Sequence, residues 1–368
     1  MSAREAGRQG PVWESDAILT SGGRTTLTRA RPAGARATIR DVAALAGVSA
    51  KSVSRVVNGQ PGSSPALRAR VLAAIERLDY RQDLMASGLR RSDGRSATLG
   101  LVLEDVSNPF SSALQRAVED VALPRRVLVL AGSSDEDANR ERDLVAAFVS
   151  RRVDGLMIVP SGRDHSYLMS ERKAGTAIVF VDRQPGFFDA DSVVADNVGG
   201  VRQGIRHLVE HGHRRIAYLG DLQTIATAAL RYRAYREELE SLAIPMDEGL
   251  VQLDVRGIEL AEAATTRLVS GARPPTALFT GQNLITIGAR QALQKMRLQR
   301  RVALVGFDDI LLADMVEPGI TVIAQDPALI GRMAAELLFR RIDGDRAPSV
   351  HRIIPTQLIA RGSGEIEP

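Results

Sequence analysis

The sequence has no cysteine, few aromatic residues and no long apolar run, and each absence excludes a class of protein. A chain without cysteine has no disulfide scaffold, no thiolate metal site and no cysteine nucleophile. No apolar run reaches the roughly 18 residues of a transmembrane helix. The N-terminus is polar and lacks the apolar segment of a secretory signal, so we expect a cytoplasmic protein.

Lysine is also scarce, and positive charge is concentrated at one end of the chain. The net charge is +4, yet residues 1–36 carry six arginines against three acidic residues, and residues 37–96 carry ten basic residues against five acidic ones. The remaining residues are therefore net acidic. This asymmetry is typical of a nucleic-acid-binding segment attached to a less basic body. At roughly 150 residues per domain, the chain is long enough for two or three domains.

Residues 1–36 are rich in Gly, Ala, Ser, Thr and Arg and show little periodicity, so we predict a disordered tail. The tail contains the single tryptophan, Trp13. It is either a basic arm that adds affinity for DNA, or an appendage or the product of a misplaced start codon, and we favour the second interpretation.

Residues 37–80 are predicted to form three short helices. Thr38, Ser49 and Ser64 each stand at an N-cap position before a helical stretch, and a proline follows Ser64 at the first helical position. Gly47 ends the first helix, three to four residues before the second begins. Three helices with a short glycine-containing turn between the first two are typical of a helix-turn-helix domain.

The first two predicted helices share a small apolar core and leave polar side chains outside. The candidate core residues are Val42, Ala43, Leu45, Ala46, Val48, Val53, Val56 and Val57. The start of the second helix enters the major groove in helix-turn-helix proteins. There, Lys51 and Arg55 can donate to guanine O6 and N7, and Ser49, Ser54 and Asn58 suit phosphate oxygens. A protein-interaction module is the alternative, which the clustered positive charge disfavours.

The segment TIRDVAALAGVSAKSVSRVVNG, at residues 38–59, resembles the DNA-binding domain of the lactose/galactose repressor (LacI) family of bacterial transcription regulators. The similarity extends over roughly residues 38–362. The resemblance implies that Ala50 and Lys51 touch base edges and that Arg55 also reaches bases. The complete set of expected DNA-binding residues is Thr38, Ser49, Ala50, Lys51, Ser52, Ser54, Arg55, Asn58 and Leu89.

Residues 81–96 are polar and basic and predict a hinge between domains. The resemblance implies a short hinge helix whose Leu89 wedges into the minor groove at the centre of the operator. Gln82 stands where the family usually has proline, and Gly88 lowers helix stability by about 1 kcal/mol relative to alanine. The hinge is therefore expected to depend on DNA for its order. A plain flexible linker is the alternative.

From residue 97 onward, short apolar runs alternate with amphipathic helical stretches, which predicts βαβ units, parallel sheets and a cleft between two layers. The runs are LGLVL (99–103), VLVLA (127–131), GLMIV (155–159), AIVFV (177–181), IAYLG (216–220), ALF (277–279) and VALVGF (302–307). The predicted fold class is thus α/β with an N-terminal helix-turn-helix domain.

Stretches such as LVLEDVSNPF (101–110) and VGFDD (305–309) extend the resemblance to a periplasmic-binding-protein-like (type I) effector domain. The resemblance implies an effector-binding and dimerisation domain at 97–362 with two subdomains. Their expected boundaries are about 97–195 with 325–354, and about 196–324 with 355–362.

Polar residues follow several predicted strands, at the edge where open α/β sheets bind ligands. Together with positions matched by motif, they form the set of expected effector contacts, namely Phe110, Asp182, Arg231, Gln282, Asp308 and Gln325. These groups suit sugar hydroxyls or an anionic metabolite. For Arg183 and Asp309 the alternative is that they cap loops or pair with each other. The aromatic residues available to stack on a sugar are Phe110, Phe187, Phe188 and Tyr232.

No metal site, cofactor site or catalytic residue is predicted. His207, His211 and His213 are spaced like zinc ligands, but no acidic or catalytic partner stands at a motif spacing. The chain has no G-x-G-x-x-G, P-loop or G-x-S-x-G motif. Asp308 and Asp309 are adjacent in sequence and point apart if extended, unlike a glycosidase pair.

The sequence therefore predicts a ligand-responsive, sequence-specific DNA-binding transcription regulator that is not an enzyme. We expect a repressor that binds a near-palindromic operator as a homodimer, with a small polar metabolite, such as a sugar or sugar derivative, as effector. The lack of a C-terminal heptad segment favours a dimer over a tetramer. A solute receptor for transport is disfavoured by residues 38–59, and a sugar-processing enzyme by the lack of a nucleophile or metal motif.

Overall fold

The computed structural model describes residues 37–57, 60–81 and 95–368. The chain divides into two compact units, with the boundary between Ser87 and Gly88. The predictions for the tail at 1–36, for Asn58 and for Leu89 lie outside the described residues.

The first unit contains the three predicted helices, which are α1 (Ile39–Ala46), α2 (Ala50–Val57) and α3 (Pro65–Arg77). Its buried core consists of Val42, Ala43, Ala46, Val53, Val56, Val71 and Ala74. Leu45 was expected in this core, but it is 44% exposed. The reason is helical geometry, because the buried positions of α1 share one face, and at 100° per residue position 45 points away from it.

The helix ends confirm the predicted caps. Thr38 and Asp41 form a reciprocal capping box, and Gly47 ends α1 in the left-handed region at φ 63°. The Ser49 hydroxyl accepts a hydrogen bond from the backbone N–H of Ser52 at 3.1 Å, and the Ser64 hydroxyl caps α3. These bonds satisfy N–H groups that a helix start leaves without intrahelical partners.

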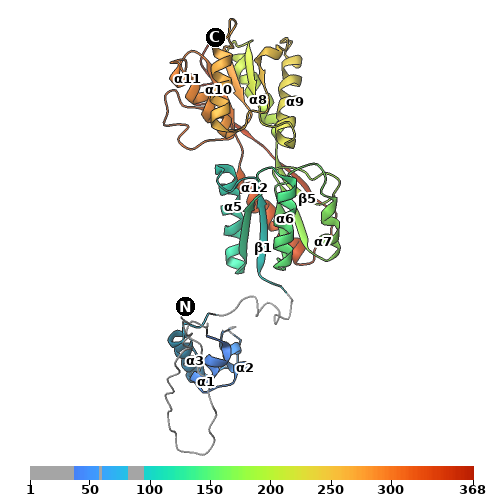
Figure 1. The fold of residues 1–368 in the computed structure, drawn as a ribbon, viewed down its shortest axis with the longest axis vertical. Helices are drawn as coiled ribbons and strands as arrows, with labels where there is room; N and C mark the ends of the chain where they lie inside the picture. Colours follow the sequence, from blue (N-terminus) through green and yellow to red (C-terminus); the bar gives the residue numbers. More distant parts are fainter. Residues whose placement is uncertain (1–36, 58–59, 82–94) are drawn as a thin grey trace, which may run out of the picture. The chain divides into compact units, whose positions relative to one another are not determined.

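Residues 95–368 form the second unit, which contains two six-stranded sheets (Figure 1). The first sheet has the order β11-β5-β4-β3-β1-β2 and is parallel throughout. Its strands are β1 (Thr98–Leu103), β2 (Leu128–Ser133), β3 (Gly155–Ile158), β4 (Ala177–Val181), β5 (Asp191–Ala195) and β11 (His351–Ile354).

The second sheet has the order β12-β10-β9-β8-β6-β7, and only its edge pair β10–β12 is antiparallel. Its strands are β6 (Ile216–Leu219), β7 (Val251–Gln252), β8 (Ala277–Thr280), β9 (Ala303–Phe307), β10 (Thr321–Ala324) and β12 (Gln357–Ile359). All seven predicted apolar runs lie on strands.

Helices cover both faces of each sheet, because alternate strand residues point to opposite faces. In the first sheet, α5 (Pro109–Ala122) and α12 (Pro327–Ile342) cover one face, and α6 (Ala138–Ser150) with α7 (Met169–Lys173) covers the other (Figure 1). In the second sheet, one face carries α8 (Asn197–Glu210) and α9 (Ala226–Ser241), and the other carries α10 (Gly257–Val269) and α11 (Asn283–Lys295). Short 3₁₀ turns lie at Leu123–Arg125, Ser166–Leu168 and Glu248–Leu250.

The chain passes between the two sheets three times within residues 95–368. The passages follow β5, follow β10 and join β11 to β12. Each sheet therefore collects strands from distant parts of the sequence, and loops from both sheets meet where the chain crosses. None of the helices in the described ranges has the length and apolar character required to cross a membrane.

Candidate functional site

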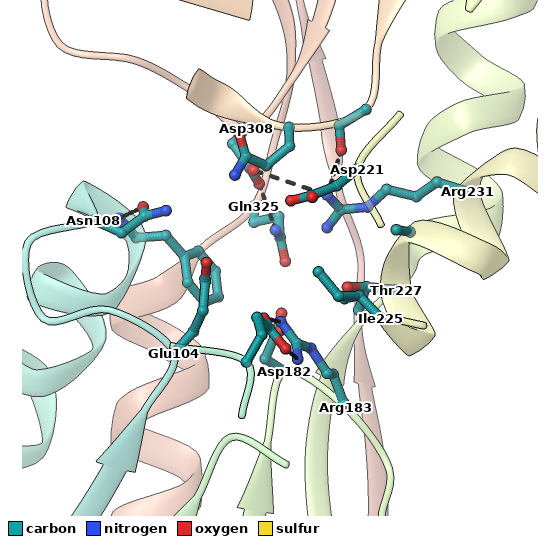
Figure 2. Close-up of a pocket in the computed structure, with 15 residues that line it drawn as sticks. Glu104, Asn108, Asp182, Arg183, Asp221, Ile225, Thr227, Arg231, Asp308 and Gln325 are labelled. Carbon is teal, nitrogen blue, oxygen red and sulfur yellow. Dashed lines mark hydrogen bonds and ion pairs between the residues drawn. The ribbon is translucent and has the colours of Figure 1, made fainter. Parts of the chain in front are cut away.

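A polar cavity lies at the carboxyl ends of the strands, between the two sheets (Figure 2). It is lined by Glu104, Asn108, Phe110, Glu136, Asp182, Arg183, Asp221, Ile225, Thr227, Ala228, Arg231, Gly281, Gln282, Asp308 and Gln325. All six residues expected to contact an effector are in this lining.

Arg231, on α9, is held rigidly at the cavity wall. Its Nε donates to Asn197 Oδ1 and its Nη1 to the Gly281 carbonyl, both at 2.7 Å. Its guanidinium lies 3.8 Å from the centre of the Phe307 ring, and its Nη1 lies 3.9 Å from Asp308 Oδ2. These contacts orient the cation before any ligand arrives.

Asp308 and Gln325 form a second fixed pair on the same wall. Gln325 Nε2 donates to Asp308 Oδ1 at 2.5 Å (Figure 2). The other amide atom, Gln325 Oε1, is buried and has no hydrogen-bond partner among the described residues. The cavity therefore contains an acceptor that a ligand donor would satisfy.

The opposite wall is built around Arg183. Its guanidinium makes two hydrogen bonds to the Glu136 carboxylate, at 2.6 and 2.7 Å, and its Nε donates to Asp182 at 3.1 Å. Asp309 instead pairs with Arg361 at 2.7 Å and caps its own loop. The suggested pairing of Arg183 with Asp309 is therefore wrong, because each residue has a different partner on its own side of the cavity.

Gln282, one of the residues expected at the cavity, has a structural task as well. The side-chain carbonyl of Gln282 accepts from the N–H groups of Leu284 and Ile285 and caps α11. Beside it, Asn283 Nδ2 donates to Asn108 Oδ1 at 2.8 Å. This buried hydrogen bond links the loops of the two sheets next to the cavity.

Three of the four proposed stacking residues are wrong. Phe110 lines the cavity, whereas Phe188 belongs to the core of the first sheet. Phe187 is 82% exposed. The ring of Tyr232 packs on that of Tyr218, with 5.5 Å between the ring centres. The sequence shows that a residue is aromatic, but only packing decides which way its ring points.

Sequence reasoning missed three carboxylates of the lining, namely Glu104, Glu136 and Asp221. Glu104 directly follows β1, and Asp221 follows β6 after one glycine. The strand-end rule that identified Asp182 would have found both. Glu136 lies in the loop after β2, where its place opposite Arg183 depends on tertiary contacts.

Carboxylates outnumber cations in the cavity lining, and the pKa values of three of them are raised. The described lining contains five carboxylates and two guanidinium groups. Burial, assisted by the nearby Glu136 carboxylate, raises the pKa of Glu104 to about 7. Burial also raises the pKa of Asp182 and of Asp221. An anionic ligand would add charge to this excess.

The expected DNA contacts lie at the start of α2. Ser49, Ala50 and Lys51 are exposed, and Ser52, Ser54 and Arg55 are half-buried. Neither Lys51 nor Arg55 forms an ion pair with another described residue. Thr38 is exposed, and its hydroxyl donates to Asp41 at 2.8 Å within the capping box.

The three histidines have ordinary partners. His207 Nε2 lies 2.6 Å from Glu365 Oε1, and His211 Nδ1 lies 2.8 Å from the His207 carbonyl. The ring nitrogens of His213 contact the Thr276 hydroxyl and the Ile366 carbonyl. Across the described ranges, no three potential metal ligands come together.

Segments of both units match families of known proteins. Residues 38–83 match the family of bacterial regulatory proteins, lacI family, and residues 205–364 match the periplasmic binding protein-like domain. The transcriptional regulator GalR of Salmonella typhimurium is 32% identical over 89% of this chain and 96% of its own length. The regulator PtxS of Pseudomonas aeruginosa is 34% identical over 90% of this chain and 97% of its own.

Solved structures agree with this assignment. The complex of the transcriptional regulator CelR with cellobiose is 30% identical, with a TM-score of 0.66 over 89% of this chain and 100% of that one. The lac repressor dimer bound to operator and an anti-inducer shares the fold, with a TM-score of 0.78 over 90% and 99% of the two chains, at 24% identity. This chain belongs to the LacI/GalR family of bacterial transcription regulators.

Proposed function

We propose that this regulator is a repressor that binds a near-palindromic operator and responds to a small polar effector. One observation carries the proposal. The chain joins a helix-turn-helix unit, whose α2 cations form no ion pair with the described residues, to a unit with a preorganised polar cavity. We assign residues 37–80 to DNA binding, 81–96 to a hinge and 97–362 to effector binding and dimerisation. Within the last, 97–195 with 325–354 and 196–324 with 355–362 are the two subdomains.

The start of α2 is the proposed reading surface. Lys51 and Arg55 are long donors that reach guanine acceptors in the major groove, and Ala50 stands beside them at a base edge. Hydroxyl groups near the helix start suit phosphate oxygens. The proposed DNA-contacting set is Thr38, Ser49, Ala50, Lys51, Ser52, Ser54, Arg55, Asn58 and Leu89.

A homodimer accounts for an exposed apolar segment of the second unit. Leu311, Leu312 and Met315 follow β9 and are 83%, 54% and 76% exposed. Large apolar side chains gathered on a surface favour contact with another protein. A second copy of the chain would cover them and supply the second reading helix that a two-fold operator requires.

The cavity is the proposed effector site, and its chemistry favours a hydroxyl-rich ligand. The proposed contacts are Phe110, Asp182, Arg231, Gln282, Asp308 and Gln325. CelR, a relative of this chain, has been solved in complex with cellobiose, which supports a carbohydrate-related effector here. The excess of carboxylates disfavours the alternative of an anionic metabolite. We further propose that the cavity binds its ligand without catalysing a reaction.

The effector acts by favouring one arrangement of the two subdomains. Coupling requires only that the ligand bind one arrangement more tightly than the other. The cavity lining comes from both sheets, and the chain crosses between them three times within residues 95–368. Closure around a ligand would alter contacts such as the Asn283–Asn108 hydrogen bond.

The test is selection of sheared genomic DNA on the purified protein at one fixed, near-physiological salt concentration. Salt must be fixed because phosphate contacts make the affinity strongly salt-dependent. We expect the retained fragments to share a near-palindrome, and the K51A/R55A double variant to lose that motif. Retention without any shared motif by the unmodified protein, with and without extracts of small metabolites, would contradict the proposal.

A further inference from the structure

The acidic cavity does not neutralise its own charge. Arg183 neutralises Glu136 and also contacts Asp182. Arg231 lies within ion-pair distance of Asp308. In the described part of the chain, no basic side chain forms an ion pair with the two remaining lining carboxylates, Glu104 and Asp221.

Both free carboxylates belong to the cavity and not to the outer surface. Asp221 is 7% exposed, and its Oδ1 accepts from the N–H of Leu222 at 2.7 Å. Glu104 is half-buried, and its pKa is raised by its own burial and by the carboxylates of Glu136, Asp182 and Asp221, against the opposing charge of Arg183. Burial disfavours the charged form of Glu104 although Arg183 attracts it. The pKa of Asp221 is likewise raised by burial, against the charges of Arg256 and Arg183.

The cavity also offers more hydrogen-bond acceptors than donors. Gln325 Oε1 is buried without a donor, and the free carboxylates add further acceptor oxygens. Arg183 already donates to Glu136. Arg231 already donates to Asn197 and to the Gly281 carbonyl. A complementary ligand therefore supplies several O–H or N–H donors and a positive charge.

We propose that the effector carries a protonated amine on a hydroxylated scaffold, as in an amino sugar, and that its ammonium group binds Glu104 and Asp221. This inference rests on the proposal that the cavity is the effector site. A neutral sugar would satisfy the acceptors but would add no cation to a lining in which five carboxylates face two guanidinium groups. An ammonium group supplies three donors and the missing charge together.

The test is isothermal titration calorimetry of the full-length protein at pH 7 with matched sugars. Each set contains a hexosamine, its parent hexose and its N-acetyl derivative, with glucosamine, galactosamine and mannosamine as the three amines. In at least one set, we expect the amine to bind roughly tenfold or more tightly than both neutral sugars, since an added charge pair commonly changes affinity by that amount.

Two variants and one control test whether Glu104 and Asp221 bind the ammonium group. E104Q and D221N should each remove the preference for the amine over the parent hexose and the N-acetyl derivative. D309N is the matched control, because Asp309 pairs with Arg361 outside the cavity lining, and it should keep the preference. Titration in two buffers of different ionisation enthalpy should show proton exchange with the buffer when the amine binds, because an ammonium group favours the charged form of Glu104, but not when the hexose binds.

Equal or tighter binding of the parent hexose in every set, absence of amine binding, or an amine preference that survives both E104Q and D221N would overturn the inference. Operator selection from genomic DNA is independent of these titrations. A protein that selects a palindrome but prefers neutral sugars refutes only the amine. A protein that binds amines but selects no common DNA motif refutes only the regulatory function.

Discussion

Replacing Arg231 by alanine should separate ligand response from DNA binding. Arg231 is only 5% exposed, and its guanidinium donates to Asn197 and Gly281 and packs on Phe307. The residue lies on α9 in the second unit, whereas the proposed DNA contacts on and around α2 lie in the first. We therefore expect R231A to abolish the response to the effector and to keep operator binding.

The magnitude follows from the contacts that are lost. Hydrogen bonds from a charged donor contribute about 1.5–3 kcal/mol each, and removing one partner of a buried ion pair costs about 3–5 kcal/mol. Because these terms overlap, we expect the free energy of unfolding to fall by about 3–5 kcal/mol. At roughly 2–4 °C per kcal/mol for a domain of this size, the unfolding temperature should fall by on the order of 10 °C.

The assay combines thermal unfolding followed by circular dichroism with operator binding measured well below the transition. R233A is the matched control, since Arg233 lies on the same helix but is exposed and forms an ion pair with Glu237 at 3.6 Å. Such a surface pair contributes about 0–1 kcal/mol. Unchanged unfolding and unchanged ligand response in R231A would refute the reasoning, as would loss of operator binding in a folded protein.

Three further predictions test other parts of the molecule. Burial raises the pKa of Glu104 from 4.5 to about 7, so its contribution to stability is fully present below pH 4.5 and is lost as the pH rises through about 7. The free energy of unfolding of E104Q, measured in urea relative to the unmodified protein, should therefore rise by about 3 kcal/mol between pH 4.5 and pH 8. Parallel pH profiles of the two proteins would contradict this. K51A should lose about 1–3 kcal/mol of binding free energy at one operator base pair and relax specificity there. R68A, on α3, should weaken binding to all sequences alike. Equal losses on all sequences in both variants would exclude base reading by Lys51. A Cβ at position 288 would lie 2.3 Å from the Ile258 carbonyl oxygen and 2.6 Å from Ala261 Cβ, so G288A should lower stability by about 1–3 kcal/mol, while G271A, whose nearest contact would be 3.5 Å away, should lower the unfolding temperature far less.

Local patterns were sufficient for most of the secondary structure. The caps at Thr38, Ser49 and Ser64 are interactions within one turn of the chain, so the residues that form them are visible in sequence. Buried parallel strands are nearly continuous apolar runs, which made the central strands predictable. The short strands β7 and β11 have no such signal, because they lie at sheet edges and are partly or largely exposed.

The cavity was predictable in position but not in charge. Residues after strands converge at one edge of an open sheet, and this rule placed Asp182, Gln282 and Asp308 at the site. The same rule applied to every strand would have added Glu104 and Asp221. Which carboxylate is neutralised depends on partners such as Arg183 and Glu136, which are 47 positions apart.

The sequence by itself determined the family, the helix-turn-helix unit, the two-sheet architecture and six of the fifteen residues that line the cavity. These features depend on local spacing, on apolar periodicity and on motifs that the chain carries in order. Only the tertiary structure decided which charges are paired, which aromatic rings face the ligand and which carboxylates remain free. Coulombic and packing contacts act through space, and the fold brings together residues that are far apart in the sequence.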